Sequence, residues 1–233
     1  PKPSSAASDV YKRQHSPGTY RSFLSPALTL SGPPDELVLA GSIVIDEGRY
    51  FKDVRVEREF LEVKRETRPP REMPSWLENL RLDVAIVDEG NFLIKNNIAE
   101  VPLRIELTVG GRIAEPTVEG EVETLGGEIF YFGTAFEVVR GRLDFADPLK
   151  LDPLVDVFAT TEIRGYEIRL YIEGVLSHMV LRLESSPPLD DQNILALITF
   201  QKTADELSEG EQTYLVNLSL LFSRDVSGAV GSP

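Results

Sequence analysis

The sequence predicts a mainly β fold, a curved antiparallel β-meander that forms an open trough and is followed by two short C-terminal helices. Apolar and charged residues alternate with period two over most of residues 36–185, which is typical of half-buried strands. Turn signals recur between these runs at short spacings, so sequential strands are expected to pair as antiparallel hairpins. After Pro187-Pro188 the spacing of apolar residues becomes helical.

Composition limits the functions that the chain can have. Its 233 residues are 42% hydrophobic, enough to bury a core, and its net charge of −14 argues against nucleic acid as a partner. Cysteine is absent and the only histidines are His15 and His178, which excludes disulfides, thiolate metal sites and multi-histidine sites. No apolar stretch reaches the length of about 20 residues that spans a bilayer, so we expect any membrane anchor to lie outside this sequence.

Before the main sheet, the pattern divides the chain into three segments. Residues 1–35 are rich in proline and serine and locally basic, and are expected to be a flexible lead outside the fold. Residues 36–66 are expected to form a β-hairpin repeat. Residues 67–76 contain Arg-Pro-Pro-Arg-Glu-Met-Pro and are expected to be a linker. Residues 77–189 then form the predicted main curved sheet.

Within the sheet, one residue of each alternating pair is expected to face an apolar groove. The candidates for its lining are apolar residues at alternate positions: Val101, Leu103, Ile105, Leu107, Val118, Val122, Ile129, Tyr131, Phe136, Val138, Leu143, Phe145, Val155, Val157, Ile168, Leu170, Ile172, Leu181 and Leu183. For any single position, an ordinary core role is the simpler interpretation. A charge on this lining, at Val122 or Leu170, is expected to abolish function while the domain stays folded.

Two features of the strand region concern its internal order. Residues 41–51 resemble residues 120–130, and residues 84–92 are a third, weaker copy; they indicate either a sheet that grows by stacking or the common similarity of β-meanders. The turn signals include Asp46-Glu47-Gly48, Asp88-Glu89-Gly90, Gly110-Gly111, Gly126-Gly127, Arg140-Gly141 and Arg164-Gly165.

Residues 190–224 are predicted to hold the two helices. Asp190 or Asp191 can cap the first, which carries Ile194 and Leu197. Ser208 and Glu211 have the spacing of a capping box for the second, whose apolar residues would also suit a strand; the cap favours a helix. Residues 225–233 are small and unpatterned and are expected to be a frayed tail.

This pattern leaves more apolar sheet than two short helices can cover. The sheet can fold into a sandwich, close into a barrel, or stay open as a trough for a ligand. Each methylene removed from water contributes about 0.8 kcal/mol, so a sixteen-carbon acyl chain crossing water faces a penalty on the order of 10 kcal/mol, most of which an apolar channel would remove.

Three blocks, at residues 109–120, 127–145 and 181–198, together resemble the C-terminal domain of the TamB family in their order and spacing. The resemblance covers about residues 77–200. It implies a taco-shaped β-sheet with an apolar groove, in the periplasm, within a protein anchored in the inner membrane. It also implies phospholipid acyl chains or unfolded hydrophobic strands as cargo, an outer-membrane barrel of the BamA/TamA type as partner, and a role in lipid transport between membranes or in outer-membrane protein assembly and secretion.

Catalytic signatures such as P-loop, dinucleotide-binding, zincin and nucleophile-elbow motifs do not occur in the sequence, so we expect a protein that is not an enzyme and needs no cofactor or metal. An interaction module that pairs a sheet edge with another chain remains the main alternative. An outer-membrane barrel is less favoured, because aromatic residues make up only 8% of the chain and Phe130, Tyr131 and Phe132 cluster together.

Overall fold

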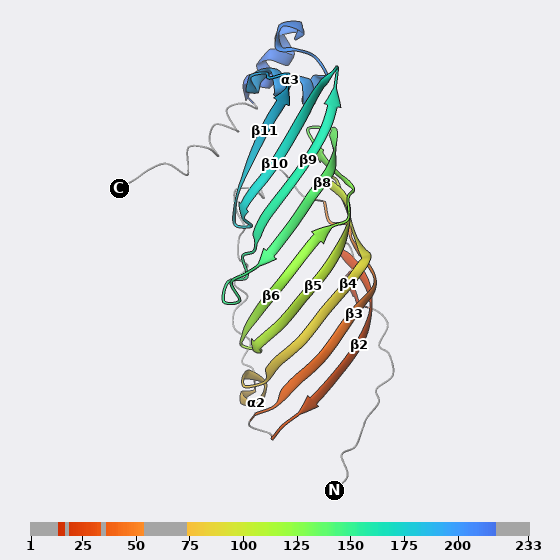
Figure 1. Cartoon of the computed structure of the whole chain (residues 1–233), viewed down its shortest axis with the longest axis vertical. Helices are drawn as coiled ribbons and strands as arrows, with labels where there is room; N and C mark the ends of the chain where they lie inside the picture. Colours follow the sequence, from red (N-terminus) through yellow and green to blue (C-terminus); the bar gives the residue numbers. More distant parts are fainter. Residues whose placement is uncertain (1–13, 17–18, 34–35, 54–73, 218–233) are drawn as a thin grey trace, which may run out of the picture.

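The computed structural model describes residues 14–16, 19–33, 36–53 and 74–217, and in them eleven strands form one sheet (Figure 1). The strand order is β1-β2-β3-β4-β5-β6-β8-β9-β10-β11, with β7 pairing with β5 and β8. The strands are β1 (Gln14–Ser16), β2 (Tyr20–Ser31), β3 (Val38–Tyr50), β4 (Arg81–Lys95), β5 (Ala99–Arg112), β6 (Glu115–Thr124), β7 (Glu128–Tyr131), β8 (Thr134–Phe145), β9 (Leu154–Ile163), β10 (Tyr166–Val175) and β11 (His178–Ser186). The predicted fold class, mainly β and dominated by antiparallel pairs, is confirmed.

The N-terminal part of the sheet differs from the prediction. A strand of twelve residues, β2, lies within the segment expected to be a flexible lead. It pairs antiparallel with β3, so the hairpin spans residues 20–50 rather than 36–66. Proline and serine content suggested a loop, but Leu24, Leu28 and Leu30 alternate along β2 and pair with β3, which stabilises the strand. Residues 54–73 lie outside the described part of the chain, and the short helix α2 (Ser75–Glu78) precedes β4.

One pair of neighbouring strands runs parallel, against the expectation of an antiparallel meander. β3 and β4 align Ile43 with Ile86 and Gly48 with Phe92. The long segment between Tyr50 and Arg81 allows the chain to cross back before β4 begins, which a tight hairpin turn cannot do.

Two glycines bear on the internal repeat. Gly41 in β3 and Gly120 in β6, which occupy matching positions in the repeated segments, have φ of +139° and +118°. A Cβ atom on either would lie 2.1 Å from a backbone carbonyl oxygen of the preceding strand, that of Ala27 or of Glu106. Gly32 and Gly174, outside the repeated segments, also have positive φ, and a Cβ atom on them would lie 2.4 Å and 2.6 Å from a carbonyl oxygen, so the likeness fits both a repeated hairpin and an ordinary β-meander.

Four of the six predicted turn sequences lie inside strands. Gly110-Gly111 lies at the end of β5, next to the turn before β6, and the other three coincide with bulges. Register shifts occur in β3 after Val44, in β4 after Glu89 and in β8 after Val138, at the Asp-Glu-Gly and Arg-Gly sequences. In β4 the buried Asp88 carboxylate accepts hydrogen bonds from the backbone N–H groups of residues 90, 91 and 92, at 3.0–3.2 Å. The polar and glycine residues therefore form bulges that lengthen strands, not chain reversals.

The C-terminal helices follow the predicted caps. Helix α3 (Asp191–Phe200) begins after Asp190, whose side chain accepts a hydrogen bond from the Asn193 backbone N–H at 2.8 Å. A 3-10 turn, η1 (Ala204–Glu206), leads to helical residues 209–217, which begin after Ser208 with the predicted Glu211 partner. Figure 1 shows α3 at the end of the molecule where β9, β10 and β11 lie. Within the described residues, no helix has the length and apolar character needed to cross a membrane.

Candidate functional site

All nineteen predicted lining residues lie on one face of the sheet, which we call the inner face. Residues paired across neighbouring strands point to the same side, and alternate residues of one strand share a side. One row across the sheet runs Ile105, Val122, Leu143, Val155. A second row runs Val138, Ala159, Leu170, Leu183, and the remaining candidates fall at alternate positions from these rows or across from them. The bulge at Val139 in β8 keeps the two parts of that strand in phase with this face.

Solvent exposure divides the nineteen residues into two groups. Eight are buried: Val101, Leu103, Ile105, Phe136, Val138, Val155, Ile168 and Leu170. Eleven are half-buried: Leu107, Val118, Val122, Ile129, Tyr131, Leu143, Phe145, Val157, Ile172, Leu181 and Leu183. The inner face is therefore neither a fully closed core nor a fully open surface.

Helix α3 closes the inner face at its C-terminal end. Ile168 and Leu170 are 0% exposed and belong to the same buried cluster as Ile194 and Leu197 of α3. The Thr134 hydroxyl at the start of β8 donates a hydrogen bond to the α3 backbone at 2.6 Å. Interiors packed in this way leave no room for a further group, so this end of the face is core.

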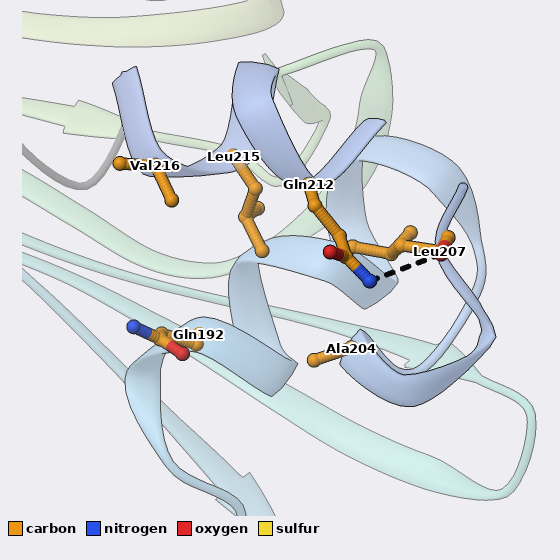
Figure 2. A pocket seen from close by; sticks show the side chains of 6 residues that line it. All are labelled: Gln192, Ala204, Leu207, Gln212, Leu215 and Val216. Carbon is orange, nitrogen blue, oxygen red and sulfur yellow. Dashed lines mark hydrogen bonds between the residues drawn. The ribbon is translucent and has the colours of Figure 1, made fainter. Parts of the chain in front are cut away.

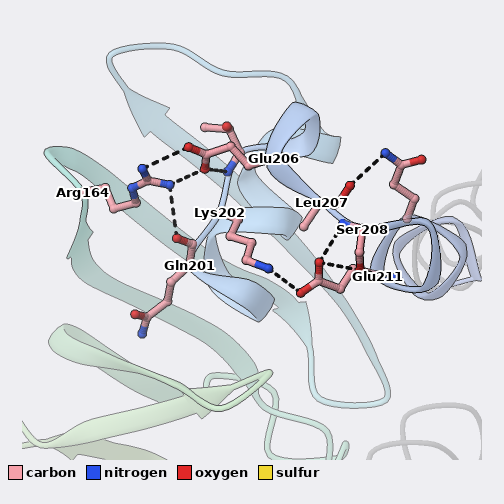
Figure 3. A network of polar contacts seen from close by, with 9 residues as sticks. Arg164, Gln201, Lys202, Glu206, Leu207, Ser208 and Glu211 are labelled. Carbon is pink, nitrogen blue, oxygen red and sulfur yellow. Dashed lines mark hydrogen bonds and ion pairs between the residues drawn. The ribbon is translucent and has the colours of Figure 1, made fainter.

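A polar network holds the turns after α3 in place (Figure 3). Arg164, in the turn between β9 and β10, donates to the Gln201 carbonyl at 3.4 Å and to the Glu206 carboxylate at 3.2 Å. Glu206 also accepts from the Thr203 backbone N–H at 3.0 Å. The Arg164 hydrogen bond, with that of Thr203, lowers the pKa of Glu206 to about 2, so the pair is ionised at neutral pH.

A second ion pair lies beside the first. Lys202 and Glu211 approach to 2.7 Å, and the Glu211 carboxylate accepts from the Ser208 backbone N–H at 2.8 Å. These bonds, that of Lys202 foremost, lower the pKa of Glu211 to about 2. Exposed pairs contribute little to stability, so the Arg164–Glu206 pair mainly orients the helical segment over the end of the sheet, and the Lys202–Glu211 pair joins the end of α3 to the last helix.

A cavity of about 190 Å³ lies among these helical segments (Figure 2). It is lined by Gln192, Ala204, Leu207, Gln212, Leu215 and Val216. The Gln212 side-chain amide donates to the Leu207 carbonyl at 3.2 Å, and no charged side chain lines the space. None of the nineteen predicted lining residues borders this cavity.

The inner face continues beyond the predicted residues to the opposite edge of the sheet. Leu28 of β2 aligns with Gly41 of β3 and Val84 of β4, and so lies on this face. Leu28 and Leu30 are 39% and 56% exposed. The alternation of Leu24, Leu28 and Leu30 is the signal that could have placed them there. The apolar side chains of the inner face are thus most exposed to solvent at the β2 edge and are buried where α3 covers them.

The other face of the sheet is charged, as expected for the solvated side. Glu121 and Glu123 of β6 point outward and pair with Arg142 and Arg104, the latter pair at 3.4 Å. The sheet therefore has one charged face that water solvates and one apolar face. Among the described residues, no group of three or more His, Cys, Asp or Glu side chains is placed to hold a metal ion.

Comparison with known proteins gives one family. The family model described as TamB, the TamB C-terminal domain, matches residues 8–232. No curated protein matches the chain.

Proposed function

The chain belongs to the TamB C-terminal domain family, a family of the cell envelope, and from this premise we propose that its inner face gives apolar cover to phospholipid acyl chains or unfolded hydrophobic strands. The protein acts without catalysis, as a module that assists lipid transport between membranes or outer-membrane protein assembly and secretion. It works in the periplasm, within a protein anchored in the inner membrane, and its partner is an outer-membrane barrel of the BamA/TamA type.

One observation carries this proposal: eleven apolar side chains share one face of a sheet and remain half-buried. Exposed apolar surface is unfavourable in water by about 25 cal/mol per Å², so a face of this kind gains free energy when a hydrocarbon covers it. Cargo would lie against the half-buried residues and the β2 edge, and would end before α3, where Ile168 and Leu170 are already covered.

Val122→Glu tests the cargo role. Val122 lies between Ile105 and Leu143 on the inner face and is half-buried, so the new carboxylate can reach water in the empty protein. Against an acyl chain the carboxylate would lose that water, which is strongly unfavourable. We expect the variant to fold normally and to retain about tenfold less co-purified phospholipid, measured by mass spectrometry, with loss of envelope function in cells.

The matched control is Val44→Glu. Val44 is 41% exposed and aligns with Val87 and, through it, with Glu106 and Glu121 of the charged face, so the same substitution adds the same charge away from the inner face. This control should behave as the unmodified protein. Full envelope function in the Val122→Glu strain would refute the proposal.

Strand addition at β11 is the second candidate function. Among the described strands β11 pairs only with β10, which leaves its other edge available. At the opposite edge of the sheet, β1 pairs only with residues 20–22 of β2. The rest of β2 contains Pro26, which lacks a backbone N–H and so disfavours an added strand. No proline interrupts β11.

Photocrosslinking separates the two candidates. A crosslinker at Arg182 of β11 should capture a strand of the outer-membrane barrel if β11 pairs with it, whereas one at Thr29 of β2 should not. If a crosslinker at Val122 captures lipid and one at Arg182 captures no protein, the result supports the cargo role and not strand addition.

A further inference from the structure

Exposed apolar side chains gather at one corner of the sheet, away from the inner face. They come from the loop between β8 and β9, the start of β9, and the turn and strand that follow β10. Leu149 is 85% exposed and Leu151 58%, and the others are Leu154, Leu176 and Val180, at 41–58%. We call these five residues the corner patch. Leu154 and Val180 lie on the two strands that flank β10. Exposed apolar groups gathered in one region of a protein surface mark interaction sites.

Hydrogen bonds hold the two loops together. The Asp152 carboxylate accepts from the Ser177 backbone N–H at 2.8 Å and from the Ser177 hydroxyl at 2.6 Å. The Leu176 backbone N–H donates to the Pro153 carbonyl at 2.9 Å. These bonds hold the loop before β9 beside the turn before β11, and both segments carry exposed leucines.

The tip of the β8–β9 loop is also fixed. Asp147 accepts from the Leu149 backbone N–H through its carboxylate at 3.2 Å and from the Lys150 backbone N–H through its carbonyl at 3.0 Å. Lys150 and Asp147 form an ion pair at 3.1 Å. The backbone is thus held in a turn that leaves Leu149 pointing into solvent, and the one lysine beside it is paired.

From the protrusion of these leucines and the pairing of Lys150 with Asp147, we infer that the corner patch inserts into the surface of a zwitterionic lipid bilayer. A bilayer accepts a convex apolar tip without shape complementarity, whereas a protein partner requires a matching hollow. The net charge of −14 opposes approach to anionic headgroups, which makes a neutral surface the favoured one. This contact does not depend on whether the inner face binds cargo.

Vesicle flotation tests the inference. The 233-residue chain is mixed with phosphatidylcholine vesicles, or with vesicles that also contain phosphatidylglycerol. We expect binding to phosphatidylcholine that weakens as the anionic lipid is added. Leu149→Ser with Leu151→Ser should lower the bound fraction about tenfold, because two apolar side chains no longer enter the bilayer.

The control variant is Val44→Ser with Val139→Ser, which removes two other exposed apolar side chains from outside the patch. It should float as the unmodified chain does. Equal loss in both double variants, or no flotation of the unmodified chain, would overturn the inference. None of these variants changes a predicted lining residue of the inner face. If the vesicle experiment contradicts bilayer binding, the Val122→Glu experiment therefore still tests the cargo role.

A fluorescent probe distinguishes the bilayer from other occupants. The chain has no cysteine, so Leu149→Cys carries a single environment-sensitive dye, with Val139→Cys as the reference. Phosphatidylcholine vesicles should shift the emission to the blue at position 149 and not at 139. A blue shift that needs no vesicles and grows with protein concentration would mean that a second copy covers the patch, and would overturn the bilayer assignment.

Discussion

Leu170→Arg is expected to unfold the domain. Leu170 is 0% exposed in the cluster that α3 covers, so the guanidinium would lose its water and gain no anionic partner. A buried unpaired charge destabilises by roughly 4–5 kcal/mol or more, a large part of the free energy of unfolding of an ordinary domain. Circular dichroism during thermal unfolding measures the loss. The sequence predicted that this variant stays folded, whereas the burial of Leu170 predicts that it unfolds.

Leu181→Arg is the comparison. Leu181 lies on the same inner face, opposite Ile172, but is half-buried, so a long basic side chain can extend to water. Its midpoint of unfolding should stay within a few degrees of that of the unmodified protein. If Leu170→Arg is as stable as Leu181→Arg, α3 does not close that end of the face.

Gly120→Ala is expected to destabilise the domain by about 3 kcal/mol or more. The φ of +118° at Gly120 is one that residues with a Cβ atom rarely adopt, at a cost of about 1–3 kcal/mol. The added Cβ would also lie 2.1 Å from the Glu106 carbonyl oxygen, so β5 and β6 would have to separate. Urea denaturation followed by circular dichroism gives the change in free energy of unfolding.

Gly126→Ala isolates the effect of the collision. Gly126 also has a positive φ, +91°, but a Cβ there would meet nothing within 4 Å. Its loss should be about 1–2 kcal/mol, the backbone penalty without the clash. Equal losses in the two variants would show that the close approach of β5 to β6 is not what requires glycine.

Much of the fold follows from local pattern. Alternation in Val101, Leu103 and Ile105 predicted both the strand and the side that these residues share, because successive residues of a strand point to opposite faces. The cap at Ser208 was predicted correctly, and of the two candidates for the first cap, Asp190 and Asp191, the structure has Asp190. Caps can be predicted because they depend only on residues within one helical turn.

Other features depended on partners far away in the chain. Strand β2 was missed because its proline and serine content resembles a loop, and its strand conformation requires β3. The Asp88-Glu89-Gly90 sequence has the composition of a turn, yet the pairing of β4 with β3 and β5 makes it a bulge. The same residues suit both structures, so composition cannot choose between them.

By itself, the sequence determined which apolar side chains share a face, since the period of two is a property of the extended backbone. Only the tertiary structure decided which of them solvent can reach. Leu170 and Leu183 are direct partners on adjacent strands, yet the first is fully buried and the second is half-buried. The burial of each side chain depends on where α3 packs and on the register between strands that are far apart in the sequence. Neither can be read from the local alternation of apolar and polar residues.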